Sequence, residues 1–335
     1  MPRQARIDAP GAIQHVIVRG IERRKIFHDD RDRHAFVERL RRTLLDSATA
    51  CYGWALMPNH AHLLLRTGRV PIATMMRRLL TGYAGTFNRR HRRHGHLFQN
   101  RYKSILCQEE PYLLELVRYI HLNPLRGRLV RDLGELDRYP YAGHSALMGK
   151  QENDWQQTGF VLGQFGRRVG VARRAYRAFV EAGIPLGRKP ELVGGGLIRS
   201  LGGWMAVKAS GKGAARLKGD ERILGDSEFV LDALKVAEEH LRRQERLQRQ
   251  GCDMDWLTRQ VATVFGISPE DIYRTGKRPP LVAARSVFCH WAVRELGLTA
   301  TAVARALGLT QPAVSIAVRL GEQIAMARDI QLKGE

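Results

Sequence analysis

Two histidines stand one residue apart at the start of an apolar run, in the segment MPNHAHLLLR (residues 57–66). Alternate side chains of a β-strand point to the same face, so on a strand His60 and His62 share one face while the residues between and after them alternate. Two imidazoles placed in this way can bind one divalent cation, whereas buried histidines without such a task need a partner for each ring nitrogen. The pattern predicts a metal site or a pair of structural histidines.

The segment PYLLELVRYIHLNP (residues 111–124) adds two further chemical groups. On a helix, Tyr119 and Asn123 are i,i+4 neighbours at the margin of the apolar face. Taken alone, a tyrosine in that position usually packs, and an asparagine directly before a proline usually ends a helix. Taken with the histidines, two ring nitrogens and an amide oxygen can hold one divalent cation, with a phenol one turn away as a nucleophile.

Local patterns predict the elements that must position these groups. The expected strands are Ala12–Arg19, Cys51–Met57, His60–Arg66 and the stretch 95–107. The expected helices run from a cap at Asp30 or Asp32 to about Ser47, from Pro71 to about His91, and from Pro111 to Pro124. This β-α-β-β-α-β-α order predicts an α+β fold, a ferredoxin-like (split βαβ) antiparallel sheet with helices on one face.

A second part of the chain follows residue 150. Residues 161–185 are predicted to be helical, and 192–225 form a glycine-rich stretch without a clear period. Helical patterns then return and end in a helix-turn-helix, with helices that begin near Thr299 and Gln311 and a turn at Gly308. We therefore expect a first domain over residues 1–150, a connector over 151–225, and an all-helical domain over 226–335.

The charge of the chain points to a polyanionic partner. The sequence holds 55 Lys and Arg against 33 Asp and Glu, a net charge of +22, and between Ser47 and Gln108 it has ten basic residues and no acidic one. Such an excess favours nucleic acid, because each phosphate neutralised by Lys or Arg releases counterions. The carboxylate-free stretch also argues against a recombinase with acidic metal ligands, and no HExxH motif supports a zinc hydrolase.

The cysteines and the hydropathy predict a soluble protein of the cytoplasm. The four cysteines have no CxxC pair, so they are expected to be reduced thiols. No apolar stretch approaches the roughly 20 residues that a membrane span needs, and the N-terminus lacks a secretory signal. We expect no membrane partner.

Four motifs in order, HVIVRGIERRKIF, ALMPNHAHLLL, FNRRHRRHGHLFQNRYKS and YLLELVRYIHLNPLRG, resemble the REP-associated tyrosine transposases. These are IS200-like members of the HUH superfamily of single-strand nucleases, and HAH matches the His-hydrophobic-His motif. The resemblance covers about residues 10–150. It implies that His60, His62 and Asn123 bind Mg²⁺ or Mn²⁺ and that Tyr119 is the nucleophile, in the YxxxN form of the motif.

The resemblance implies a metal-dependent transposase that cleaves and rejoins single-stranded DNA at hairpin-forming repeats through a 5′-phosphotyrosine. A phosphotyrosine bond keeps about the energy of the broken diester, so rejoining to a 3′-OH costs little. Because Mg²⁺ prefers oxygen ligands, we expect Mn²⁺ to work at least as well. The location expected is the bacterial cytoplasm, at the nucleoid, with the protein a monomer or a homodimer.

Basic residues in or beside these motifs are candidates for DNA contacts: Arg19, Arg23, Arg89, Arg90, Arg101 and Lys103. Phe98 and Tyr102 add aromatic faces on which unpaired bases could stack. His91, His94 and His96 lie among arginines and are expected to meet phosphate or solvent more readily than metal.

The C-terminal part, over about residues 253–325, resembles the DNA-binding domain of the bacterial replication initiator DnaA. The resemblance implies duplex contacts by Lys277 and Arg278 in the minor groove and by Thr310, Gln311, Ser315 and Arg319 in the major groove. The segment TQPAV stands where the initiator has Asp-His-Thr-Thr, so its sequence preference does not carry over. The alternative for this part is a plain helical bundle.

Two rival functions remain open. A DNA-binding regulator could keep a transposase-like sheet as a scaffold, and an RNA-binding protein could stack bases on the same kind of sheet. The joint presence of His60, His62, Tyr119 and Asn123 favours the enzyme, because a scaffold need not retain all four.

Overall fold

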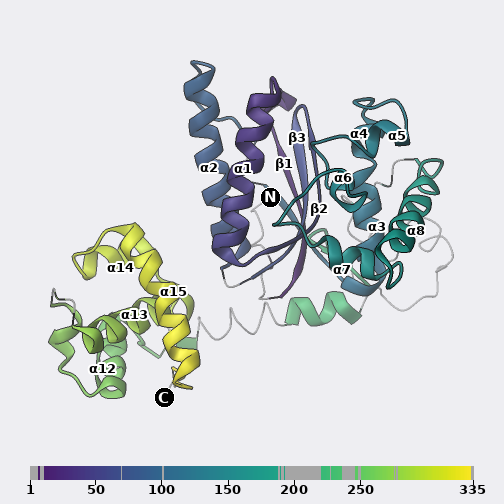
Figure 1. Ribbon diagram of the computed structural model, residues 1–335. Coiled ribbons are helices and arrows are strands. Elements are labelled where there is room, and N and C mark those ends of the chain that lie inside the picture. Colours follow the sequence, from purple (N-terminus) through teal and green to yellow (C-terminus); the bar gives the residue numbers. More distant parts are fainter. Residues whose placement is uncertain are drawn as a thin grey trace, which may run out of the picture. The chain divides into compact units, whose positions relative to one another are not determined.

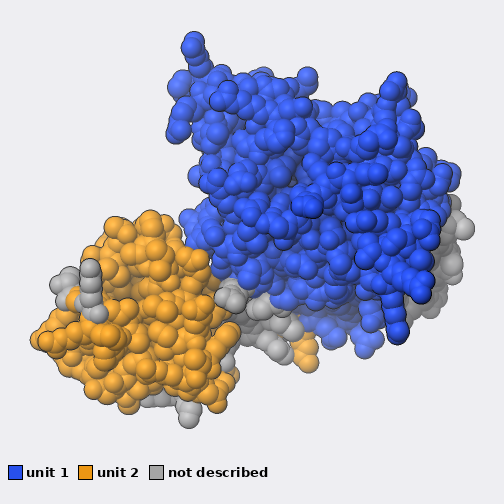
Figure 2. All heavy atoms as spheres, viewed as in Figure 1, with its two compact units in different colours: residues 1–234 blue, residues 235–335 orange. Residues whose placement is uncertain are grey.

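The computed structural model describes residues 7, 11–68, 70–99, 102–187, 189, 192, 220–226, 228–235, 246–247, 250–274, 276 and 278–332. The chain forms two compact units, Met1–Leu234 and Lys235–Glu335, which Figure 2 colours separately. Each unit has a buried cluster of apolar side chains.

The first unit is built on a five-stranded mixed sheet with the strand order β2-β3-β1-β4-β5 (Figure 1). Its strands are β1 (Ile13–Arg19), β2 (Ala50–Met57), β3 (His60–Arg66), β4 (Lys103–Cys107) and the short β5 (Ile223–Leu224). Strands β1 to β4 pair with one another in antiparallel fashion, and β5 runs parallel to β4. The predicted α+β class is correct, although only the last five residues of the stretch 95–107 form a strand.

Helices α1 (Asp30–Ser47) and α2 (Ile72–Arg90) cover one face of the sheet (Figure 1). Their apolar side chains share a buried cluster with alternate strand residues, among them Val16, Val18, Leu63, Leu65, Phe36, Leu40 and Leu79. Asp29 caps α1 by accepting the backbone N–H of Asp32 at 3.1 Å. The predicted caps, Asp30 and Asp32, are therefore wrong, because Asp32 supplies the N–H that is capped.

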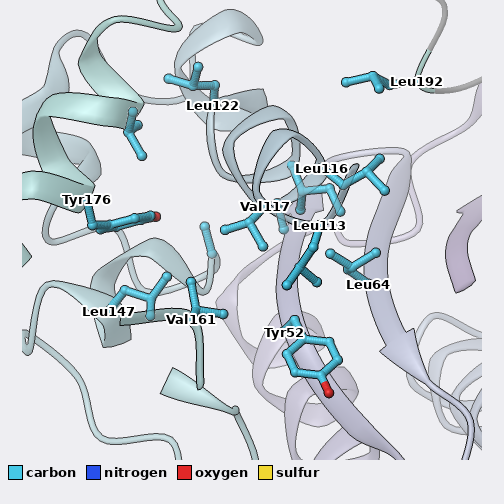
Figure 3. Close-up of a cluster of buried hydrophobic side chains, with 14 of the residues drawn as sticks. Tyr52, Leu64, Leu113, Leu116, Val117, Leu122, Leu147, Val161, Tyr176 and Leu192 are labelled. Carbon is cyan, nitrogen blue, oxygen red and sulfur yellow. The ribbon is translucent and has the colours of Figure 1, made fainter. Parts of the chain in front are cut away.

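Helix α3 (Glu109–His121) covers the opposite face. Figure 3 shows its side chains Leu113, Leu116 and Val117 beside Leu64 of β3, in a second buried cluster. The prediction of helices on one face only is wrong. Strands β2 and β3 are buried on both faces, so each face is covered by helices.

Further helices continue this second layer: α4 (Asn123–Arg126), α5 (Leu133–Leu136), α6 (His144–Leu147), α7 (Thr158–Gly163) and α8 (Val169–Glu181). The single helix predicted over 161–185 is thus two helices, with a break at 164–168 that contains Gly166 at φ 144°. Val161 and Tyr176 are buried in the same cluster as α3, so the compact unit extends past the predicted boundary at 150. Most of 192–225 lies outside the described residues.

The second unit contains helices α12 (Met254–Phe265), α13 (Pro279–Arg294), α14 (Ala300–Ala306) and α15 (Gln311–Ala327). Thr299 caps α14 and Thr310 caps α15, each by accepting a backbone N–H three residues on. Helix α15 approaches α13 at Gly321, where an added Cβ would overlap the carbonyl oxygen of Ser286. This contact requires glycine.

All four cysteines are buried and unbridged. Within the part of the chain that the structure describes, no helix is long and apolar enough to cross a membrane.

Candidate metal and nucleophile site

The two histidines of the HAH motif project from β3 toward the face that α3 covers. Their ring centroids lie 5.1 Å apart, edge to face. His62 is 3% exposed, and His60, at the first position of the strand, is half-buried. The period of the strand therefore puts both imidazoles on one face, as predicted.

Tyr119 lies against this pair. Its ring centroid is 5.9 Å from that of His62, in an edge-to-face arrangement. The apolar face of α3 docks on the sheet through Leu116 and Ile120, and Tyr119 follows at the margin, where it is half-buried. A phenol from one layer and imidazoles from another thus meet at one place.

A third histidine, which the sequence did not single out, completes the cluster. His15 of β1 is fully buried, and its Nε2 lies 2.9 Å from Nδ1 of His62. Its ring stacks on His62 at 5.2 Å and meets Tyr119 edge-on at 6.1 Å. The available signal was an imidazole in the apolar strand AIQHVIVR, but pairing of β1 with β3 is needed to bring His15 beside His62.

The environment keeps the two motif histidines neutral. Burial, with a smaller contribution from Arg19, lowers the pKa of His60 to about 4. Burial holds the pKa of His62 well below 6.5, and the neighbouring His15, His60 and Arg19 act in the same direction. Neutral imidazole is the form that binds a metal, so this donor pair fits a divalent cation.

Asn123 is placed differently from the expectation. Helix α3 ends at His121, and Asn123 begins the short α4, so Tyr119 and Asn123 belong to different helices. The Asn123 side-chain nitrogen donates to the carbonyl oxygen of Ile120 at 3.3 Å. That bond leaves the amide oxygen as the atom that could face a cation, and the role of Asn123 stays a prediction.

Arg126 is a second residue that the sequence analysis missed. Its guanidinium carbon lies 5.7 Å from the centroid of the Tyr119 ring, and Nη2 donates to the carbonyl oxygen of Gly183 at 3.0 Å. Burial lowers its pKa, and within the described residues Nε and Nη1 are buried without a hydrogen-bond partner. The site therefore combines a phenol, three imidazoles and one partly desolvated cation.

A separate cluster joins α1 to the end of α2. The possible metal-binding atoms of His28, Asp32 and His91 all lie within 4.8 Å of one another. His91 Nε2 lies 3.0 Å from both carboxylate oxygens of Asp32, and Arg90 pairs with Asp32 and Asp29. The Arg90 guanidinium already neutralises the Asp32 carboxylate. The cluster is therefore better suited to an ion pair that joins α1 to the end of α2 than to a metal cation. His91 thus meets a carboxylate, and its expected contact with phosphate stays a prediction.

The other candidates for DNA contacts in the first unit differ in how exposed and how free of ion pairs their side chains are. Arg19 is exposed at the end of β1, directly opposite His60. Arg23, Arg89 and Lys103 are exposed as well. The guanidinium of Arg90, in contrast, is paired with Asp29 and Asp32. Arg101 lies outside the described residues. Phe98 and Tyr102 are half-buried against the cluster under α1 and α2.

In the second unit, Arg278 is exposed at the start of α13, and Lys277 lies outside the described residues. The Thr310 hydroxyl caps α15, and the Gln311 side-chain nitrogen donates to Ser315 Oγ at 3.1 Å. Arg319 is half-buried on the same helix. Their DNA roles stay predictions.

Comparison with known proteins gives a class for part of the chain. Residues 10–123 match the family described as "Transposase IS200 like", a segment that runs from β1 through α3 to Asn123. This segment is similar to an IS200-like transposase domain, and the remainder of the chain is outside the match. A solved structure described as a REP-associated tyrosine transposase bound to a REP hairpin matches 47% of this chain and 98% of its own, at 14% identity and a TM-score of 0.38. No curated protein sequence matches the chain.

Proposed function

We propose that the protein is a metal-dependent transposase or endonuclease that acts on single-stranded DNA at hairpin-forming repeats. Its first unit would hold the catalytic site, with a ferredoxin-like split βαβ arrangement of the first four strands and α1 and α2. The observation that carries the proposal is the meeting of the Tyr119 ring with the imidazoles of His15 and His62. The IS200-like match over residues 10–123 supports the same class.

The proposed reaction is a transesterification. The phenolic oxygen of Tyr119 bonds to phosphorus and loses its proton, while the bond from phosphorus to the 3′ oxygen breaks and that oxygen leaves as a hydroxyl. The strand on the 5′-phosphate side stays attached to the tyrosine, and attack by another 3′-OH reverses the step. A divalent cation held by His60, His62 and Asn123 would polarise the phosphate and stabilise charge on its oxygens. Mg²⁺ and Mn²⁺ are the candidates.

Basic residues around the site suit a polyanionic strand. Arg19 is exposed beside His60, and Arg126 lies beside Tyr119 with buried N–H groups, so both sides of the cluster carry positive charge. Their position fits the neutralisation of phosphates near the scissile bond.

The second unit would be a DnaA-like helix-turn-helix domain that binds the duplex stem or flanking duplex. Two capped helices, α14 and α15, are joined by a short turn with Gly308 at φ 62° and rest on α13, as such a motif requires. The candidate contacts are Lys277, Arg278, Thr310, Gln311, Ser315 and Arg319.

A covalent-adduct assay tests the catalytic proposal. The full chain is incubated with Mn²⁺ and a hairpin oligonucleotide that carries a label at its 3′ end. A labelled protein band that resists SDS is expected, because the 5′-phosphotyrosine retains the labelled strand. Tyr119→Phe should abolish the band, whereas Tyr112→Phe, two turns earlier on α3 and also half-buried, should leave it. An adduct that survives in Tyr119→Phe would refute the assignment of the nucleophile.

The same assay separates the rival functions. His60→Ala should lose the adduct while salt-sensitive binding of the oligonucleotide is retained, since the imidazole serves the cation and not the strand. Binding without any adduct in the unaltered protein would instead support a regulator. Stronger binding of the corresponding RNA hairpin would support an RNA-binding protein.

A further inference from the structure

We propose that His15 and Asn59 are positioning residues that fix both motif histidines in one tautomer, with Nδ1 protonated and Nε2 bare. The consequence for catalysis rests on the proposed function, but the tautomers follow from hydrogen bonds alone. Each motif histidine is the end of a chain of two bonds that starts at a backbone carbonyl oxygen. A carbonyl can only accept, so it sets the direction of every bond in its chain.

The first chain starts at Leu192. Its carbonyl oxygen lies 3.2 Å from Nδ1 of His15, so that nitrogen must carry a proton. The Nε2 of neutral His15 is then bare and accepts from Nδ1 of His62 at 2.9 Å. His15 is fully buried beside His62, and a second proton on it would place an imidazolium without a counter-charge in the interior. His62 therefore keeps its proton on Nδ1 and leaves Nε2 as a lone pair.

The second chain starts at Arg23. Its carbonyl oxygen accepts from the side-chain nitrogen of Asn59 at 3.0 Å, which fixes the orientation of that amide. The Asn59 side-chain oxygen then lies 2.6 Å from Nδ1 of His60 and can only accept. The reverse orientation of the amide would set two oxygens against each other. His60 is thus protonated on Nδ1 as well, and its Nε2 is bare.

Both ligand candidates consequently offer the same atom, Nε2, without any loss of a proton when a cation binds. A ligating histidine normally donates its other ring N–H to a fixed acceptor, which orients the ring and sets its tautomer. Here the two acceptors are unlike each other, an imidazole on β1 and an amide in the turn between β2 and β3. Each acceptor can therefore be removed separately.

Nuclear magnetic resonance tests the tautomers in the metal-free protein. Two-bond proton–nitrogen correlation spectra of the protein with ¹⁵N-labelled histidine identify which ring nitrogen is protonated. His15, His60 and His62 should each show protonated Nδ1, whereas the exposed His94 and His96 serve as solvated references within the same spectrum. Protonated Nε2 on either His60 or His62 would overturn the proposal.

Matched variants test the two chains. His15→Leu removes the acceptor of His62, while His15→Gln offers a carbonyl oxygen to His62 and an N–H to Leu192. His15→Leu should disturb the His62 signal and leave that of His60, and Asn59→Ala should do the opposite. Changes in both signals for each variant would show that the residues act only on folding. Changes in neither signal would show that they do not fix the tautomers and would overturn the proposal.

Affinity for Mn²⁺ alone, measured by calorimetry, gives a second readout. Loss of an acceptor typically costs 10–100-fold in metal affinity, so His15→Leu and Asn59→Ala should each weaken binding by about that factor. His15→Gln should restore most of it, and equal affinities for the Leu and Gln variants would contradict the proposal. If His60 and His62 are protonated on Nδ1 but no DNA adduct forms, this inference stands and the transposase proposal fails. If an adduct forms but Nε2 of either histidine is protonated, the transposase proposal stands and this inference fails.

Discussion

At the residue scale, several of the buried polar side chains of the first unit are histidines. One group is the candidate site, and a second joins the end of α3 to α6 and α8, where Tyr176 Oη lies 2.8 Å from Nδ1 of both His121 and His144. His144 Nε2 in turn lies 2.9 Å from a carboxylate oxygen of Asp137. These bonds connect α3, the helix that carries Tyr119, to α6 and α8.

His144 predicts a pH dependence of stability. Burial lowers its pKa below 6.5, although Asp137 opposes the shift and Arg177 adds to it. The unfolded chain binds a proton at His144 more readily than the folded chain, so the stabilisation is present above about pH 6.5 and is lost as the pH falls below it. In urea unfolding between pH 7 and 5, His144→Gln should flatten the dependence by up to about 1.4 kcal/mol per pH unit. An unchanged slope would count against this account.

At the element scale, close approach between elements depends on small residues at single positions. In the second unit, α15 crosses α13 where Gly321 faces the backbone of Ser286, and the Cβ of His290 would lie 2.8 Å from an added methyl group. In the first unit, by contrast, Gly159 of α7 has open space around it.

Substitution of these two glycines by alanine should therefore have opposite effects. Gly321→Ala gains up to about 1 kcal/mol of helix propensity but forces a methyl group into a backbone carbonyl, so a net loss of about 1–3 kcal/mol is expected. Gly159→Ala adds the same methyl group where nothing lies within 4 Å and should be neutral or slightly stabilising. Urea unfolding of both variants measures the difference, and equal stabilities would show that α13 and α15 do not approach as described.

At the scale of the whole molecule, the chain joins two units with separate apolar clusters and a net charge of +22. The candidate catalytic residues all belong to the first unit, and the candidate duplex contacts of α13 and α15 belong to the second. This division predicts that cleavage and duplex binding can be separated.

Two fragments test the division. Residues 1–234 should still form the hairpin adduct, because His15, His60, His62, Tyr119 and Arg126 are all present. Residues 235–335 should bind duplex DNA with an affinity that falls steeply with salt, and Arg278→Ala with Arg319→Ala should weaken that binding. Gel-shift titrations at two salt concentrations measure both properties. Loss of the adduct from a folded first fragment would show that the second unit takes part in catalysis.

Local sequence determined most of the elements and part of the site. The strand His60–Arg66 has the predicted bounds, and its period of two was enough to put both motif histidines on one face, because that period is a property of the strand itself. Helix α1, which ends at Ser47, was also predicted to end at about that residue, from the spacing of Phe36, Leu40 and Leu44. These features depend on contacts within a few residues.

The tertiary structure decided what no local pattern contains. The pairing of β1 with β3 brings His15 beside His62, 47 residues along the chain, and the carbonyl of Leu192, 177 residues from His15, directs the proton on that ring. Helix α3 covers a second face of the sheet, and this could not be read locally, because strand pairing decides which residues share that face. Partners of a buried polar group are chosen by the packing of distant segments, so their identity becomes visible only once the chain is folded.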